Sequence, residues 1–478
     1  MMGYQTNDNT AVHADRRGTL WQEIKNAIRG TEADYTQIGL KRAILLLAAP
    51  MILELVMEST FAVMDIFFVG KLGAWAVATV GLTETFLYLL YSIGIGLSMA
   101  VTAVVARRVG EKNKEGAALA AVQSLFIAVL ASLPFAIAGI IYPKELLALM
   151  GSDAKGIAEG YRYTQWMLGG NVVIMLLFVI NAVFRGAGDA AIAMRVLLVA
   201  NAVNIILDPI FIFGWGPIPA MGLEGAAIAT NVGRGIGVAM QLRVLFGKGG
   251  RHIHVRFSQL YWDAKAAFSI LRTSVGGIGQ MIVSMTSWIF LMRILAGIGS
   301  EAVAGATIAL RVMMFTMMPA MGLANAAATL VGQNLGAGRP ERAEAAVWHI
   351  GLYNMVFLLA ISAGYFFFNE PLMRIFTDDA QVIAIGGEWL RILSYSFFVY
   401  GWWMVSVQAF NGAGDTRTPT KINVVFFWLI QIPLSYLLAE VLGWGHSGVF
   451  WGVFVSETSV GLFTLWLFSR GRWKTAAV

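Results

Sequence analysis

The chain has 478 residues, of which 58% are hydrophobic and 13% are charged, and its mean hydropathy is +0.69. Soluble domains carry about 25% charged residues, so this composition excludes a soluble globular protein and indicates a polytopic membrane protein. The sequence has no cysteine, which excludes disulfides, thiolate metal sites and iron–sulfur clusters. The formal net charge of +6 fits Lys- and Arg-rich cytoplasmic loops better than a nucleic-acid partner.

The N-terminal segment, residues 1–40, is polar and contains no signal-peptide core, and we expect it in the cytoplasm. Part of it could form a short helix that lies on the inner membrane surface. The apolar side chains on one face of that helix would be Leu20, Trp21, Ile24, Ala27 and Ile28. The alternative for this segment is a partly disordered tail.

Apolar windows of about 20 residues predict twelve transmembrane helices. We expect them at 43–68, 77–105, 119–142, 160–184, 192–214, 224–246, 266–295, 303–333, 346–368, 386–410, 420–440 and 447–469.

The distribution of basic residues predicts the orientation of these helices. Clusters precede the first helix and follow every second one, and they include Arg16, Arg17, Lys41, Arg42, Arg107, Arg108, Lys112, Lys114, Arg185, Arg195, Arg243, Lys248, Arg251, Arg256, Arg339, Arg342, Arg417, Lys421, Arg470, Arg472 and Lys474. The alternate loops are poor in cations or carry acids, such as Asp378 and Asp379. Cytoplasmic loops are enriched in Lys and Arg, so we expect a multi-pass protein of the cell (inner) membrane with both termini in the cytoplasm.

The sequence contains an internal repeat. The motif FRGAGD, from Phe184 to Asp189, recurs as FNGAGD from Phe410 to Asp415, 226 positions later, and this register holds without a gap from about residue 70 to 190. An offset of six helices keeps the orientation parallel, and such repeats enclose a central cavity and rock against each other. We therefore predict an all-α membrane protein with twelve transmembrane helices in two six-helix lobes related by a parallel internal repeat. The expected lobes are 41–246 and 265–470, joined by a cytoplasmic linker, 247–264, and followed by a tail, 471–478.

Three carboxylates interrupt the apolar first helix. Glu54, Glu58 and Asp65 fall within about 40° of one another on a helical projection. A charge at the bilayer centre costs roughly 2.5–3.5 kcal/mol, so this stripe must face protein or water, as an ion or substrate pathway does. The repeat-equivalent residues are Gln280, Ser284 and Leu291. The second half thus builds the same helix without these acids, which favours a functional role over a structural one.

Further polar residues at membrane depth occur in the same half. Asn204 and Asp208 share one face of the fifth helix, and their repeat partners are the apolar Ile430 and Leu434. Asn181 and Thr230 lie in the fourth and sixth helices. Burial disfavours the charged carboxylate, so such groups can exchange a proton near neutral pH, and carboxylate, amide and hydroxyl oxygens together can coordinate Na⁺. Both uses stay open. Asn204 could instead make a structural interhelical hydrogen bond, and Asp208 could satisfy backbone freed by Pro209.

These motifs resemble the multidrug and toxic compound extrusion (MATE) family over essentially the whole chain after residue 40. The specific pieces are Asp65 four residues before Val69 and Gly70, RGAGD ending at Asp189, NIILDP from Asn204, GAAIAT ending at Thr230, and VGQNLGAG from Val331 to Gly338.

The resemblance implies a twelve-helix antiporter that exports organic cations or amphipathic compounds in exchange for H⁺ or Na⁺. It implies ion coupling, including a Na⁺ site, at Asp65, Asn181, Asn204, Asp208 and Thr230. Glu58 matches a position that is often uncharged but polar, and Glu54 matches no position with a known role, so both depart from the family pattern. We expect a small-molecule substrate, a bilayer environment, no nucleic-acid partner, no cofactor and a monomer.

Several rival functions remain as alternatives. A flippase for a lipid-linked precursor would need a cationic cavity for a pyrophosphate head group, and an exporter of one specific metabolite would share the carrier fold. A major facilitator transporter lacks support, because its acidic–basic signature after the second helix is replaced by the RRVGEK stretch that starts at Arg107. The sequence has no Gly-x-Ser-x-Gly or His-Glu-x-x-His motif, so we do not expect an enzyme. A channel would need no alternating access, and flux saturation and counterflow would distinguish it from a carrier.

Overall fold

The computed structural model describes residues 20–31, 33–247 and 253–476, and these fold almost entirely into helices. The first half contains α1 (Leu20–Arg29), α2 (Leu40–Gly70), α3 (Ala74–Gly110), α4 (Lys114–Ile141), α5 (Pro143–Leu149), α6 (Ala154–Gly169), α7 (Asn171–Ala187), α8 (Ala190–Phe213) and α9 (Leu223–Phe246). The second half contains α10 (Ala264–Ile298), α11 (Ser300–Gly336), α12 (Pro340–Arg374), α13 (Ala380–Ser394), α14 (Phe397–Ala413), α15 (Arg417–Asn423), α16 (Ile432–Tyr436) and α17 (His446–Ser469).

The membrane-spanning pattern largely follows the prediction. Among the described residues, ten helical segments are long and apolar enough to cross a membrane, and the bent pair α13 and α14 can form an eleventh. The expected span at 224–246 forms α9, which is 24 residues long but does not pass the same apolarity test. The reason is its polar content, which includes Thr230, Arg234 and Gln241. These side chains face protein rather than lipid, as described below.

Three predicted spans are not regular helices. The fourth is divided at Gly170 into α6 and α7, and the tenth bends by 64° between α13 and α14. In the eleventh, the segments Val424–Gln431 and Leu437–Val441 are π-helical and flank α16, which contains Pro433. Proline lacks the backbone N–H of a regular helix, and π-helical turns are one way to accommodate it.

The internal repeat is visible in the backbone. α7 and α14 both end at a left-handed glycine, Gly188 and Gly414, each with φ of +91°. In both motifs the following aspartate N–H donates to the phenylalanine carbonyl five residues earlier, at 2.8 Å for Asp189 and 3.0 Å for Asp415. This Schellman-type ending needs positive φ, which glycine adopts without strain. The repeated motif is therefore a repeated helix terminus.

The two halves cross each other with approximate two-fold symmetry at α3 and α11. A Cβ atom on Gly110 would lie 2.0 Å from the Gln333 carbonyl oxygen, and one on Gly336 would lie 2.2 Å from the Arg107 carbonyl oxygen. Gly110 and Gly336 are 226 positions apart, as are Arg107 and Gln333. Each half thus presents the same surface to the other, and any side chain at these glycines would force the helices apart.

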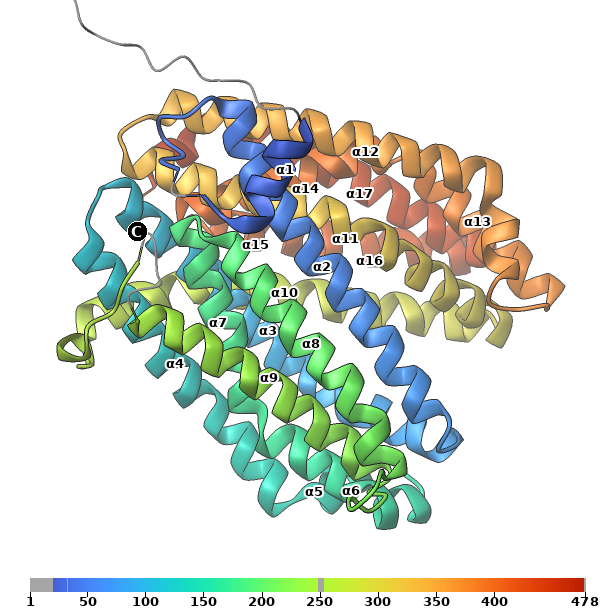
Figure 1. Ribbon diagram of the computed structural model, residues 1–478. Helices are drawn as coiled ribbons and strands as arrows, with labels where there is room; N and C mark the ends of the chain where they lie inside the picture. The colour runs from blue at the N-terminus through green and yellow to red at the C-terminus, as the bar shows by residue number, and fades with distance from the viewer. Residues whose placement is uncertain (1–19, 32, 248–252, 477–478) are drawn as a thin grey trace, which may run out of the picture.

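The buried side chains form separate cores. One core lies mainly within the first half and also includes Ala267 and Ile270 at the start of α10. Another lies within the second half, between Leu291 and Val453. A third combines α1 and the start of α2 with α11, α12 and α14. Figure 1 shows the two sets of helices close together at the end where α1 lies and diverging toward the opposite end. The lobe boundaries at 246 and 265 stay a prediction.

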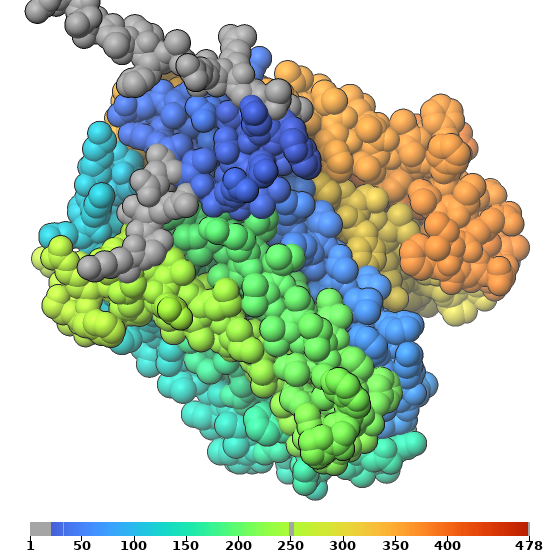
Figure 2. All heavy atoms as spheres, in the orientation of Figure 1, coloured from blue at the N-terminus to red at the C-terminus, as the bar shows by residue number. Residues whose placement is uncertain are grey.

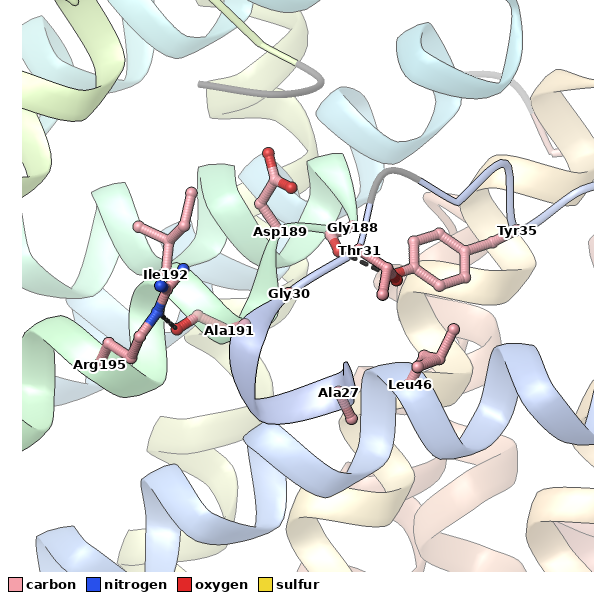
Figure 3. A pocket seen from close by; sticks show the side chains of 10 residues that line it. All are labelled: Ala27, Gly30, Thr31, Tyr35, Leu46, Gly188, Asp189, Ala191, Ile192 and Arg195. Carbon is pink, nitrogen blue, oxygen red and sulfur yellow. Dashed lines mark hydrogen bonds between the residues drawn. The ribbon is translucent and has the colours of Figure 1, made fainter. Parts of the chain in front are cut away.

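The segment that follows α1 contacts both halves; Figure 2 shows the blue N-terminal part of the chain between the green helices of the first half and the orange helices of the second. The Tyr35 hydroxyl donates to the Gly188 carbonyl oxygen of the first half at 3.1 Å (Figure 3). From the second half, Arg339 donates to the Thr36 carbonyl oxygen at 2.7 Å and Arg342 to that of Tyr35 at 3.2 Å. A helix does form at the expected place, and Ala27 is buried against the third core. Its position on the membrane surface stays a prediction.

Candidate functional site

A cavity of about 430 Å³ lies between the two halves. Its first-half wall comes mainly from α2, α3, α7, α8 and α9, and it carries four charged side chains: Glu54, Glu58, Arg185 and Arg234. Two of the three stripe acids therefore face the cavity. We expected Arg185 to belong to a cytoplasmic loop cluster, but it lies in the last turn of α7 and its side chain, 16% exposed, reaches the cavity.

The second-half wall of this cavity differs in chemistry. Its described lining residues carry no charge, and they comprise Gln280, Met281, Ser284, Met317, Met321, Ala324, Asn325, Ala328, Tyr400, Trp403, Met404, Val407, Gln408, Asn411 and Asn423. Methionine side chains are flexible and polarizable, so they adapt to apolar surfaces of different shapes. The cavity thus joins a charged wall to an uncharged one in which methionines lie among neutral polar side chains.

Glu58 on α2 is paired with an arginine of α9. Arg234 Nη2 lies 2.8 Å from Glu58 Oε1, and the Asn201 side-chain amide of α8 lies 3.4 Å from Glu58 Oε2. The Arg234 guanidinium also lies 5.0 Å from the centre of the Phe61 ring. The Arg234 side chain is 11% exposed and that of Glu58 is 33% exposed. This well-made pair attaches α2 to α8 and α9.

Glu54, one helical turn earlier, is paired more loosely. Arg185 Nη1 lies 3.5 Å from Glu54 Oε1, which is longer than the roughly 2.7–2.9 Å of a charge-assisted hydrogen bond. The other oxygen, Glu54 Oε2, is buried without a hydrogen-bond partner among the described residues. The Glu54 side chain is only 5% exposed. A buried carboxylate oxygen without a donor is costly unless another group binds there.

A second polar group lies inside the first half, outside the cavity lining. Asn204 and Asp208 of α8 and Thr230 of α9 are all buried. In the orientation that satisfies the Asn204 amide best, its nitrogen donates to Asp208 Oδ2 at 3.0 Å. Its oxygen then accepts from the Thr230 backbone N–H at 3.0 Å and from the Thr230 hydroxyl at 3.2 Å. We call these three residues the α8–α9 cluster.

Asp65, the third acid of the stripe, belongs to this buried region rather than to the cavity lining. It is half-buried near the end of α2 and interacts electrostatically with Asp208. Tyr163 of α6 is 4% exposed, and the charges of both aspartates act on it electrostatically. Two carboxylates in one apolar environment disfavour double ionisation, so a proton or cation at this place would relieve their repulsion.

Asn181 does not join the α8–α9 cluster through any hydrogen bond described for it. Its side-chain oxygen accepts from the Gln241 amide of α9 at 2.5 Å, and it lines the cavity. The structure thus divides the seven predicted site residues. Asp65, Asn204, Asp208 and Thr230 gather inside the first half, whereas Glu54, Glu58 and Asn181 line the cavity.

The sequence reasoning missed the two arginine partners. Arg234 lies four residues after Thr230 inside an expected span, and an intramembrane arginine is itself a signal of a functional or paired charge. Arg185 was assigned to a loop because it lies close to a predicted helix end. Gln241 carries no comparable signal, since an amide at a helix face is common.

The oxygens of the α8–α9 cluster suit either a proton or a small hard cation. Among residues 20–31, 33–247 and 253–476, no group of three or more His, Asp or Glu side chains could hold a metal ion by itself. A Na⁺ ion here would therefore need amide and hydroxyl oxygens beside the carboxylates of Asp65 and Asp208.

Comparison with known proteins agrees with this architecture. The family model MatE matches residues 50–210 and again 276–437, so the two matches start 226 positions apart. A probable multidrug resistance protein NorM of Thermotoga maritima is 27% identical over 441 residues, covering 92% of this chain and 94% of its own length. An FAD transporter of Shewanella oneidensis is 26% identical over 412 residues, covering 84% and 89% of the two chains.

Solved structures match the fold. A multidrug resistance MATE family transporter of the MOP superfamily in an outward-facing conformation superposes with a TM-score of 0.84, at 24% sequence identity. The match covers 94% of this chain and 98% of that one. The repeat and the long apolar helices define a multi-pass membrane protein, and the relatives that it matches are transporters rather than enzymes. The chain belongs to the MatE family, which confirms the resemblance noted in the sequence.

Proposed function

We propose that the protein is a secondary active antiporter that exports organic cations or amphipathic compounds in exchange for H⁺ or Na⁺. The observation that supports this best is the α8–α9 cluster with Asp65 beside it. Asn204, Asp208 and Thr230 are hydrogen-bonded to one another inside the first half, outside the cavity lining, and Asp65 interacts electrostatically with Asp208. At 226 positions after Asn204 and Asp208, the second half carries the apolar residues Ile430 and Leu434.

Ion binding and substrate binding can be coupled through α2 and α8, because each of these helices reaches both the cavity and the α8–α9 cluster. α2 carries Glu54 and Glu58 toward the cavity and Asp65 toward the cluster. α8 carries Asn201, which contacts Glu58, and Asn204 and Asp208 of the cluster. An ion that binds at Asp65 and Asp208 would shift α2, with Pro50 as a point of bending, and would change the charged cavity wall. Reciprocity then requires that ion and substrate weaken each other's binding.

The proposed setting is the cell (inner) membrane with both termini in the cytoplasm and the carrier acting as a monomer. The basic clusters of the sequence support this orientation. The diverging ends of the two halves would then face outward, and the transport cycle would consist of the halves rocking about the cavity. The two halves would act as lobes with the boundaries given above.

A second candidate function is the export of one specific metabolite. Arg185 and Arg234 support it, because the cavity offers guanidinium groups to an anion as well as carboxylates to a cation. One relative is named an FAD transporter, and FAD carries phosphates. A flippase for a lipid-linked precursor has less support, since each cavity arginine is paired with a glutamate and the four charges sum to zero.

The test is transport by the purified full-length protein in proteoliposomes, with a pH gradient and a Na⁺ gradient imposed one at a time. A lipophilic organic cation such as tetraphenylphosphonium serves as the probe. We expect one gradient to drive its movement against its own concentration gradient, and we expect saturation and counterflow. Movement that never exceeds equilibration under either gradient would refute antiport and favour a channel or a facilitator.

A further inference from the structure

We propose that the Glu54–Arg185 pair is a substrate-selecting site, and that it selects amphipathic zwitterions, which carry one cationic and one anionic group. A zwitterion would insert between the two side chains, with its cation on Glu54 and its anion on Arg185. The inference rests on the proposed transport function and narrows its substrate class. It makes Glu54, which matches no position with a known family role, a determinant of specificity.

The repeat provides the first argument. Glu54 and Arg185 correspond, 226 positions later, to Gln280 and Asn411. These two residues make the same contact in the second half, where Gln280 Nε2 donates to Asn411 Oδ1 at 2.9 Å. Both pairs line the cavity. The fold therefore makes this helix contact with a neutral amide pair in one half and with an ion pair in the other, so the charges are not needed to join the helices.

The geometry of the charged pair provides the second argument. Arg185 Nη1 and Glu54 Oε1 are 3.5 Å apart, and Glu54 Oε2 has no donor although the Glu54 side chain is only 5% exposed. The pair is therefore incompletely satisfied and open to exchange. The Glu58–Arg234 pair is different, because it is shorter, at 2.8 Å, and has Asn201 and Phe61 as additional neighbours. We infer that this second pair stays closed and holds α2 in place.

The preference for a zwitterion follows from charge balance. A plain cation that binds Glu54 competes with Arg185 and leaves that guanidinium without a counter-charge, which is unfavourable in a buried place. An anion that binds Arg185 leaves the Glu54 carboxylate without a counter-charge in the same way. A zwitterion supplies a cation to Glu54 and an anion to Arg185, so neither side chain is left without a counter-charge. Its apolar body would lie against the methionine-rich second-half wall, which includes Met281, Met317 and Met404.

The experiment compares two probes that differ only in one charge: a rhodamine dye with a free carboxylate, which is a zwitterion, and its methyl ester, which is a cation. Initial rates are measured in proteoliposomes under the gradient that drives tetraphenylphosphonium. We expect the wild-type protein to transport the zwitterion with a KM about tenfold lower than that of the ester. An equal or lower KM for the ester would overturn the inference while leaving the proposed antiport intact.

Three variants locate the preference. Glu54→Gln combined with Arg185→Asn gives the first half the amide pair that the second half already forms, so the double variant should fold. The ratio of the KM for the ester to the KM for the zwitterion should then fall from about ten to about one. Arg185→Asn alone leaves a free carboxylate and should favour the ester. Glu54→Gln alone should disfavour the ester further. If all three raise the KM of both dyes in parallel, the pair is only structural and the inference fails.

Two controls separate this failure from other causes. The melting temperature of the double variant reports folding, and Asp378→Asn, in the loop before α13, should leave the KM ratio of the two dyes unchanged. If no gradient drives tetraphenylphosphonium or either dye in the wild-type protein, the proposed antiport fails and the inference falls with it.

Discussion

Arg234 Nη2 of α9 lies 2.8 Å from Glu58 Oε1 of α2, so the carboxylate at the centre of the acidic stripe has an arginine as its counter-charge. The pair is asymmetric in burial, because the arginine side chain is 11% exposed and the glutamate side chain is 33% exposed. The stripe is therefore not a row of unpaired acids. Its first two members form ion pairs at the cavity wall, and only Asp65 belongs to the buried aspartate region.

This asymmetry predicts different costs for removing either partner. Glu58→Ala removes the salt-bridge partner of a buried guanidinium and should reduce the free energy of unfolding by about 2–3 kcal/mol, somewhat less than for a fully buried pair because Glu58 reaches the cavity. Arg234→Ala should cost less, because the freed carboxylate of Glu58 can be hydrated in the cavity. Thermal unfolding of the purified variants measures both.

The matched control is Glu370→Ala, which removes an exposed ion pair with Arg374 at 3.8 Å. Exposed pairs contribute about 0–1 kcal/mol, so this variant should unfold close to the wild-type temperature. Equal losses for Glu58→Ala and Glu370→Ala would show that the Arg234 pair is solvated rather than buried.

Helix crossing at α3 gives a second prediction. Gly110→Ala places a methyl carbon 2.0 Å from the Gln333 carbonyl oxygen, so it should separate α3 from α11 and markedly lower the yield and melting temperature. Gly81→Ala is the matched control on the same helix, because no atom lies within 4 Å of its added Cβ. Alanine also favours helix, so Gly81→Ala should be neutral or slightly stabilising. Similar melting temperatures for the two variants would contradict the crossing.

The segment after α1 gives a third prediction. Tyr35→Phe removes the hydroxyl that donates to Gly188 and should cost about 1 kcal/mol, because a buried carbonyl oxygen loses its donor. The loss should favour opening at the converging end. The chain has no cysteine, so a single cysteine introduced at Thr329, whose hydroxyl donates to the Arg185 carbonyl oxygen across the halves, reports that opening by its rate of thiol labelling.

We expect faster labelling of this reporter in the Tyr35→Phe background than in the parent. Tyr436→Phe, at a tyrosine that is 55% exposed, is the control and should leave the rate unchanged. A labelling rate in Tyr35→Phe equal to that of the control would mean that the segment does not hold the two halves together.

Much of the fold follows from the sequence. Hydropathy located most of the spans, and the FRGAGD and FNGAGD motifs predicted a repeat that reappears as the equal left-handed endings at Gly188 and Gly414. The sequence also indicated that Asn204 and Asp208 share a helix face. Period and spacing within one helix are sufficient for such statements.

The pairing between helices did not follow from the sequence. Whether Asn181 meets Thr230 or Gln241 depends on the rotation of α7 against α9, and helical period does not determine that rotation. The same applies to Arg185, which lies near a helix end yet turns inward. α9 is polar for a predicted span because its polar residues contact α2, α7 and α8 rather than lipid.

The central claim is that ion coupling resides at Asp65 and Asp208, apart from the substrate cavity. Its most direct test is to measure gradient-driven transport and gradient-free substrate counterflow in the same proteoliposomes for Asp65→Asn and Asp208→Asn. Asp378→Asn, which removes a carboxylate from the loop before α13, is the control. We predict that both site variants lose gradient-driven transport but keep counterflow, because the cavity and the moving halves remain. Full gradient-driven transport in both site variants would contradict the account.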